Sequence, residues 1–161
     1  MEKRTLSFEL AVFESVEALS PEDRQLLQQA KDAQAGAYAP YSHFKVGAAV
    51  LLSNGKVVIG SNQENASYPS GLCAERVAVF QAGAQFPGVR IDKIAITASA
   101  ANAPTSKPAA PCGNCRQAIF EYEHKQGKPI ELLLMGSIGE IYKCPSVKDL
   151  LPLAFSDDYL S

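Results

Sequence analysis

The spacing of the last two apolar runs constrains the fold more than any other feature of this sequence. Residues 130 to 135 and 140 to 144 both have the character of strands, and only Gly136-Ser137-Ile138-Gly139 separates them. A parallel crossover connection needs a dozen or more residues, so four residues allow only a tight turn. We therefore expect these two strands to be antiparallel.

The segments before this pair alternate between strand and helix patterns. Asn54-Gly55 separates two apolar runs and is typical of a hairpin turn. Ser20-Pro21 combines an N-cap residue with a proline suited to the first helical position. The expected elements are helices at 21 to about 37, 73 to 84 and 115 to 125, and strands at 46 to 52, 56 to 61, 91 to 99, 130 to 135 and 140 to 144. This order predicts an α/β fold in which a mixed five-stranded sheet carries helices on its faces.

Composition limits the classes of protein that the chain can represent. The 161 residues are 47% hydrophobic and 20% charged, which favours a single folded domain over residues 1–161, and residues 1–19 before the first helix receive no role. A formal charge of −2 gives no attraction to a polyanion, so we expect a small partner and no nucleic acid.

The sequence shows no secretory signal and no apolar run of the roughly 20 residues that span a bilayer. We therefore expect no membrane partner and a cytoplasmic location, where cysteines stay reduced.

Three of the four cysteines stand at the starts of two expected helices. Cys73 precedes one helix, and Cys112 and Cys115 form a C-x-x-C at the start of another. Loops at one end of an open α/β sheet converge, and helix N-termini favour the thiolate form that binds metal. Three sulfur ligands would leave one position of a tetrahedral zinc open, as in catalytic sites.

Glu75 lies two residues after Cys73 and gives this pattern a catalytic interpretation. A carboxylate beside a zinc-bound water can accept its proton and pass that proton to a substrate nitrogen. Taken alone, the same residue would be read as an acid that interacts with the helix dipole. The combination of C-x-E with a distant P-C-x-x-C favours the catalytic interpretation.

Two other classes of protein use similar cysteine patterns. A thiol oxidoreductase would use Cys112 and Cys115 as a dithiol, without metal and without any need for Cys73 or Glu75. A structural zinc module would recruit Cys144 as a fourth ligand and close the site. We expect Cys144 instead to be a small buried hydrophobic residue.

Cys73-Ala74-Glu75-Arg76 and Pro111-Cys112-Gly113-Asn114-Cys115-Arg116-Gln117 together resemble the signature of the zinc-dependent cytidine deaminases. The resemblance extends from about Tyr38 to Phe155 and includes YAPYSHFKVGAAV, NQENASYPSGLCAER, PCGNCRQ and LLPLAF in order. It implies a three-layer α/β/α fold, with one Zn²⁺ per subunit bound by Cys73, Cys112 and Cys115. It also implies Glu75 as the proton shuttle for attack of zinc-bound hydroxide at C4 of the pyrimidine, and Arg76 as a donor to a sulfur.

The implied reaction is hydrolytic deamination of cytidine and deoxycytidine to uridine and deoxyuridine with release of ammonia, a step of pyrimidine salvage. A cytosine nucleoside antibiotic is the alternative substrate. By the same resemblance, Asn62 and Glu64 hydrogen-bond the ribose, Phe44 packs on the pyrimidine, Ala66 and Tyr68 reach a neighbouring subunit's site, and Phe155 closes that site. A homotetramer with shared active sites follows from these assignments. Relatives that act on nucleic acids have a helix between the last two strands, for which this chain has no room.

Overall fold

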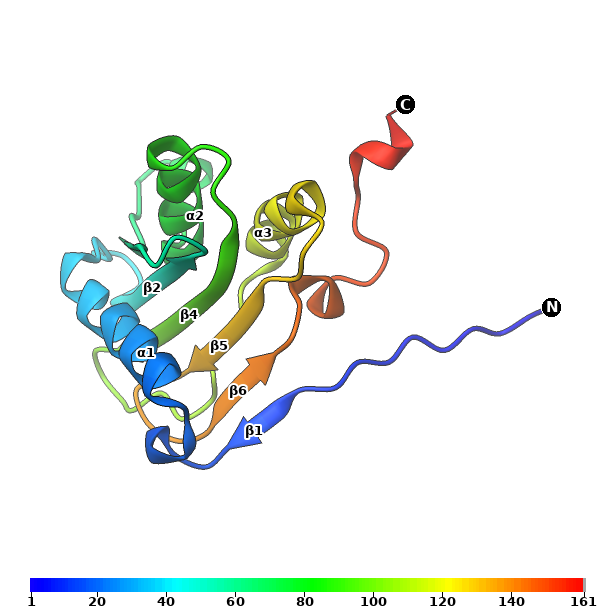
Figure 1. Ribbon diagram of the computed structural model, residues 1–161. Coiled ribbons are helices and arrows are strands. Elements are labelled where there is room, and N and C mark those ends of the chain that lie inside the picture. The colour runs from blue at the N-terminus through cyan, green and yellow to red at the C-terminus, as the bar shows by residue number, and fades with distance from the viewer. Residues whose placement is uncertain (161) are drawn as a thin grey trace.

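A computed structural model describes residues 1–160 and shows a mixed six-stranded sheet (Figure 1). The strands lie in the order β1-β6-β5-β4-β2-β3, and every neighbouring pair is antiparallel except β4 with β5. Their bounds are β1 Ala11–Phe13, β2 Phe44–Leu52, β3 Val57–Ser61, β4 Ile91–Ala100, β5 Glu131–Met135 and β6 Ile141–Cys144. The antiparallel pairing of β5 with β6 confirms the prediction from the four-residue turn.

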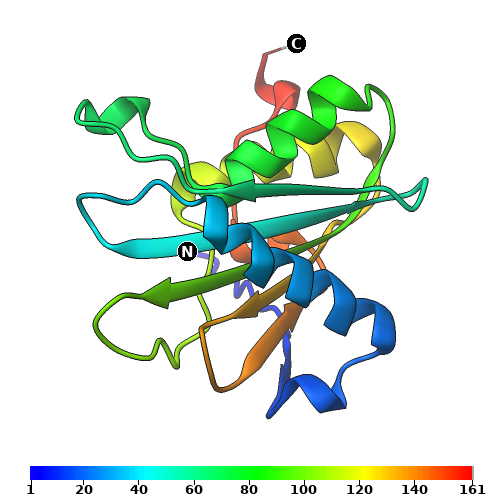
Figure 2. The same cartoon turned by 90° about the vertical axis from the view of Figure 1, so that its left-hand side faces the viewer.

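Three helices cover the two faces of the sheet, so the fold has three layers (Figures 1 and 2). Helix α1, Pro21–Ala33, packs on one face through a cluster that includes Leu26 and Leu27. Helices α2, Ala74–Gln85, and α3, Gly113–Gln126, pack on the other face around a larger apolar cluster. The three-layer α/β/α arrangement is the predicted one. Within residues 1–160, no helix is long and apolar enough to cross a membrane.

The sheet has one strand more than the sequence predicted. Strand β1 lies within residues 1–19, to which no role was assigned, and pairs with β6 at the sheet edge, Ala11 opposite Lys143 and Phe13 opposite Ile141. Three residues with two exposed side chains carry too little hydrophobic pattern to be recognised as a strand. Their conformation depends on a partner about 130 residues away, so it is a tertiary effect.

Helix α1 begins where predicted and ends earlier. Ser20 is its N-cap, and its Oγ accepts a hydrogen bond from the Asp23 backbone N at 3.1 Å. The helix ends at Ala33 and continues as a 3₁₀ turn over Gln34–Gly36, whereas the apolar spacing suggested a helix to about Ala37. Tightening of the last turn into 3₁₀ geometry is common at helix ends.

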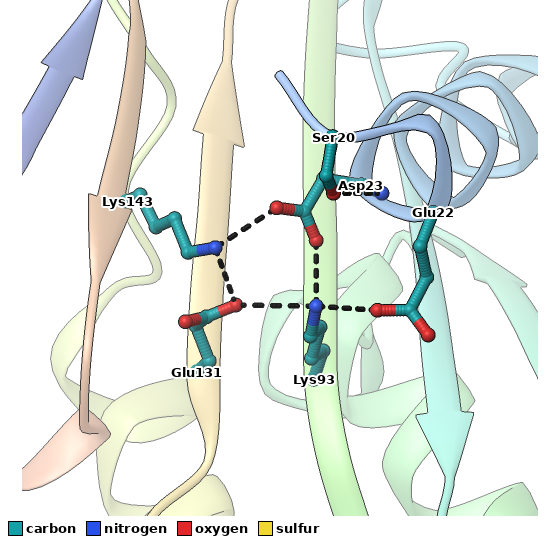
Figure 3. Close-up of polar contacts among 6 residues, drawn as sticks. All are labelled: Ser20, Glu22, Asp23, Lys93, Glu131 and Lys143. Carbon is teal, nitrogen blue, oxygen red and sulfur yellow. Dashed lines mark hydrogen bonds and ion pairs between the residues drawn. The ribbon is translucent and has the colours of Figure 1, made fainter.

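A group of charged side chains joins the start of α1 to the sheet (Figure 3). The Asp23 carboxylate is 3% exposed and accepts hydrogen bonds from Lys93 Nζ on β4 at 2.7 Å and from Lys143 Nζ on β6 at 2.9 Å. Glu131 on β5 lies 3.0 Å from Lys143 Nζ, and Glu22 lies 2.6 Å from Lys93 Nζ. We call these five residues the α1 charge network.

Close contact between α2 and the sheet depends on Gly60 in β3. A Cβ at this position would lie 2.6 Å from Ala74 O and 2.6 Å from Ala78 N, both in α2. The missing side chain therefore lets the N-terminal half of α2 lie directly on the strand. Cys73 and Glu75 are at this end of the helix, so the same contact helps to place them.

Candidate metal centre and substrate cavity

The structure brings the three motif cysteines together. One sulfur from each of Cys73, Cys112 and Cys115 lies within 4.8 Å of the other two, and the Sγ atoms of Cys112 and Cys115 are 3.4 Å apart. Cys73 is the N-cap of α2, Cys112 is the N-cap of α3, and Cys115 is in the first turn of α3. Two helix N-termini therefore point their positive ends at one cluster of sulfurs, which favours thiolates there.

Hydrogen bonds among these sulfurs shift the pKa values of the Cys73 and Cys115 thiols in opposite directions. A bond from Cys115 is the main cause that lowers the pKa of the Cys73 thiol to about 6, although burial and the Glu75 carboxylate act in the opposite direction. The same bond to Cys73, followed by burial, raises the pKa of Cys115 above its ordinary value. The Cys73 sulfur thus has thiolate character, and a bound cation would extend that character to all three sulfurs.

Glu75 is the buried carboxylate beside this cluster. It is 4% exposed, and its buried Oε2 has no hydrogen-bond partner among residues 1–160. An unpaired buried carboxylate oxygen is costly unless something outside the protein chain satisfies it. Three converging sulfurs with an unsatisfied carboxylate beside them fit Zn²⁺ that keeps one position for water or substrate.

Arg76 lies near the sulfurs but makes a different contact from the one expected. Its Nη2 donates to Gly71 O at 3.3 Å, and its Nε is buried without a hydrogen-bond partner among residues 1–160. The structure thus shows no Arg76 hydrogen bond to a sulfur. The guanidinium charge is still close enough to help lower the pKa of Cys73.

A cavity of about 660 Å³ opens beside Cys73, Glu75 and Cys112. This volume lies in the usual range for small-molecule sites. Four of the predicted substrate residues line the cavity, namely Phe44, Asn62, Glu64 and Tyr68. Other lining residues were not singled out from the sequence and include Tyr41, Ser42, Val46, Ile96 and Asn114.

Asn62 holds the first residues of β2, and Glu64 holds the segment that leads into this strand. The Asn62 side chain accepts a hydrogen bond from Val46 N at 2.8 Å and donates one to Phe44 O at 2.9 Å. Glu64 accepts bonds from Tyr41 N at 2.9 Å and from the backbone and hydroxyl of Ser42. The Ser42 hydroxyl is the main cause that keeps the pKa of the Glu64 carboxyl below its ordinary value. Both side chains retain hydrogen-bonding capacity for a ligand, since an amide can make four bonds and a carboxylate about four.

Comparison with known proteins identifies the family. Residues 20–127 match the family model described as the cytidine and deoxycytidylate deaminase zinc-binding region. The chain belongs to the cytidine deaminase family. A cytidine deaminase of Halalkalibacterium halodurans is 45% identical over 135 residues, which cover 83% of this chain and 95% of that protein. A cytidine deaminase of Mycobacterium tuberculosis is 40% identical over 131 residues, which cover 81% and 87%.

A solved structure agrees with this family assignment. The crystal structure of a cytidine deaminase from Burkholderia pseudomallei has a TM-score of 0.72 and 41% identity, and the match covers 85% of this chain and 100% of that chain. The zinc-binding region of the cytidine deaminase family spans Cys73, Cys112 and Cys115. The metal of the family is therefore Zn²⁺, and the three-cysteine cluster gives one zinc per chain.

Two residues that the cytidine deaminase resemblance assigned to the site lie apart from the cavity. Ala66 is exposed in the loop before the 3₁₀ turn Tyr68–Ser70 and does not line it. Phe155 is 56% exposed, and its ring stacks on that of Tyr159 with 5.6 Å between the centroids. The Phe155 backbone O accepts a hydrogen bond from the Gln117 side chain. Within one chain, neither residue reaches the substrate cavity.

Cys144 also lies apart from the metal centre. It is fully buried on β6 and packs in the apolar cluster beneath α2 and α3. The group of metal-binding side chains found around Cys73 contains the other three cysteines and not this one. The position of Cys144 agrees with a small buried hydrophobic residue and gives no support to a closed four-cysteine site.

Proposed function

We propose that this chain catalyses the hydrolytic deamination of cytidine and deoxycytidine to uridine and deoxyuridine, with release of ammonia. The observation that carries this proposal is Glu75, which lines the cavity beside the three-cysteine cluster and whose buried Oε2 has no hydrogen-bond partner among residues 1–160. The relatives named cytidine deaminase at 40 to 45% identity support the same activity.

Each residue of the centre would have a distinct role. Cys73, Cys112 and Cys115 would hold Zn²⁺, which acidifies a coordinated water and so supplies the nucleophile for C4 of the pyrimidine. Glu75 would accept one proton of the attacking water and place it on ring N3, and would then move the second proton of that water to the amino group, which leaves as ammonia. Its burial keeps bulk water from competing for the same proton.

The cavity residues would bind the rest of the nucleoside. Phe44 would pack on the pyrimidine ring, and the remaining hydrogen-bonding capacity of Asn62 and Glu64 would be used by the ribose hydroxyls. The Glu64 carboxylate would repel a phosphate placed nearby, which favours a nucleoside over a nucleotide. Arg76 would offset the excess negative charge of three thiolates on one zinc.

A homotetramer with shared active sites remains part of the proposal. Tyr68 lines the cavity and is still 77% exposed, while Ala66 next to it in the loop is exposed as well. In an assembly, both side chains and Phe155 would contact a neighbouring subunit. Sedimentation equilibrium should give four times the chain mass of 17.2 kDa, and a monomer with full activity would refute shared sites.

Dependence of the zinc site on reduced thiolates agrees with a cytoplasmic location of the protein.

The direct test compares Glu75→Gln with the wild-type protein. Conversion of cytidine to uridine is followed by ultraviolet absorbance, and zinc is measured on the same sample. The wild type should turn over with about one zinc per chain, and the variant should keep its zinc while kcat falls by about 10² to 10⁴-fold. Glu121→Gln, an exposed glutamate on α3, is the matched control and should behave as wild type.

Two outcomes would change the proposal. Wild-type protein that carries zinc but acts only on a cytosine nucleoside antibiotic would keep the site and replace the substrate. Substantial turnover by the Glu75→Gln protein would remove Glu75 from the mechanism.

A further inference from the structure

The loop that precedes β2 contains a serine whose hydroxyl connects two parts of the proposed substrate site. Ser42 lines the cavity between Tyr41 and Phe44. Its Oγ donates to Glu64 Oε1 and accepts a hydrogen bond from Phe44 N at 3.1 Å. One hydroxyl supplies one donor and two acceptor positions, so both bonds can form together. The carboxylate expected at the ribose and the backbone of the residue expected at the pyrimidine are thus joined through one side chain.

The rest of the loop shows why this connection matters. His43, between the two bonded residues, has a φ of 55°, in the left-handed region. That conformation is strained for a non-glycine residue and persists only where its surroundings hold it. Phe44 is held at N by Ser42 and at O by Asn62. Removal of the hydroxyl would release one end of Phe44 and one oxygen of Glu64.

We propose that Ser42 is a positioning residue for nucleoside binding, which fixes Glu64 and Phe44 relative to each other. The proposal rests on the proposed function. Ser42 has no contact with Cys73 or Glu75 among its hydrogen bonds within residues 1–160, so its effect belongs to substrate affinity and not to proton transfer. Glu64 would keep its bonds from two backbone N–H groups without the hydroxyl, so the loop loses alignment but not its fold.

The test is a comparison of Ser42→Ala and Ser42→Thr with the wild-type enzyme. Ser42→Ala should raise KM for cytidine about tenfold, the equivalent of one lost hydrogen bond to a charged group, with kcat changed less than about threefold. Zinc content and melting temperature should stay at wild-type values. Ser42→Thr keeps a hydroxyl and should restore KM to within about threefold. Ser53→Ala, an exposed serine in the β2–β3 turn, is the control and should change neither constant.

A second comparison tests whether Ser42 acts through Glu64. In a Glu64→Ala background the acceptor of the Ser42 hydroxyl is absent, so Ser42→Ala should raise KM by much less than in wild type. Equal effects in both backgrounds, an unchanged KM in Ser42→Ala, or a loss of zinc in that variant would each overturn the positioning role. If the wild type turns over cytidine and Ser42→Ala matches it, only this inference fails. No turnover by the wild type would overturn the proposed function and this inference together.

Discussion

Neither Cys112 nor Cys144 forms a disulfide within residues 1–160, yet we expect opposite effects of their replacement. Cys112 is exposed and belongs to the three-sulfur cluster, while Cys144 is fully buried in the apolar core. Cys112→Ala should weaken zinc binding by on the order of 100-fold or more, because two sulfurs and water make a poor site. Replacement of a residue that only contacts a metal ligand already lowers metal affinity by about 10 to 100-fold. Competition with a chromophoric chelator measures this affinity.

Cys144→Ala is the matched control for that measurement. It should keep wild-type zinc affinity and lose about 1 kcal/mol of stability, since a buried sulfur is exchanged for a small void. Tight stoichiometric zinc in Cys112→Ala, or loss of zinc in Cys144→Ala, would show that the ligand set is wrong.

At the scale of residues, the sequence predicted those side chains whose chemistry is unusual at their spacing. Three cysteines and Glu75 form such a pattern, and the structure brings them together. Ser42 was missed because a serine in a polar loop is ordinary, and its two hydrogen-bond partners are separated from each other by 20 residues of sequence. Arg76 was expected at a sulfur, but its backbone contact to Gly71 depends on loop geometry that no spacing encodes.

At the scale of elements, Gly60 links the packing of α2 to the position of the metal centre. Gly60→Ala would place a methyl group 2.6 Å from the backbone of Ala74 and Ala78, so the start of the helix must shift. We expect a loss of about 1 to 3 kcal/mol in the free energy of unfolding and weaker zinc binding, because Cys73 is displaced relative to the α3 cysteines. Urea denaturation and zinc titration measure the two effects.

Gly47→Ala separates general destabilisation from displacement of the site. A Cβ at Gly47 would lie 1.9 Å from Ala30 O, so it displaces α1 on the opposite face of the sheet. This variant should be destabilised while its folded fraction binds zinc with normal affinity. Normal zinc affinity in Gly60→Ala would contradict the link between helix packing and the metal centre.

The sequence predicted the long elements well because their apolar runs and the turn residues that flank them agree on where each element lies. Gly136-Ser137-Ile138-Gly139 allowed one connection, and Asn54-Gly55 marked the hairpin of β2 with β3, which the register confirms. Strand β1 has no such agreement, because its pairing with β6 is decided by contact between distant parts of the chain. Local pattern therefore predicted every strand except β1, whose three residues carry no strand pattern of their own.

At the scale of the whole molecule, the α1 charge network attaches the first layer to the sheet. Asp23 on α1 joins Lys93 of β4 and Lys143 of β6, two strands that are separated by β5 (Figure 3). Apolar periodicity predicted that α1 has a face to bury, but not that a buried carboxylate would fix its start. Such a contact combines three elements and has no local signature.

The charge states of this network set a pH window for its contribution to stability. Burial alone raises the pKa of the Asp23 carboxyl, but hydrogen bonds from Lys143 and Lys93 outweigh it, so the pKa lies below its usual 3.8. Burial alone lowers the pKa of Lys93, but hydrogen bonds to Asp23 and Glu22 raise it above 10.5. The contribution of Asp23 is therefore fully present above about pH 5 and is lost as the pH falls through its folded-state pKa.

Asp23→Asn should accordingly destabilise the protein in a pH-dependent way. At pH 7 we expect a loss of about 1 to 3 kcal/mol in the free energy of unfolding, because two hydrogen bonds to a charged acceptor are weakened and two lysines lose their buried partner. The difference from wild type should shrink as the pH falls below about 5 toward the folded-state pKa of Asp23, below which the wild-type carboxyl is protonated and resembles the amide. Urea midpoints at pH 7, 5 and 3.5 measure it.

Zinc loss in acid affects wild type and variant alike, so it cancels in their difference. Glu2→Gln removes one partner of the exposed Glu2–Arg4 pair and should change stability at none of the three pH values, since exposed ion pairs contribute little. A difference for Asp23→Asn that is the same at pH 7 and pH 3.5 would show that packing of the side chain, and not its charge, holds α1 on the sheet. A shrinking difference would show that the first layer of the fold depends on the ionised carboxylate.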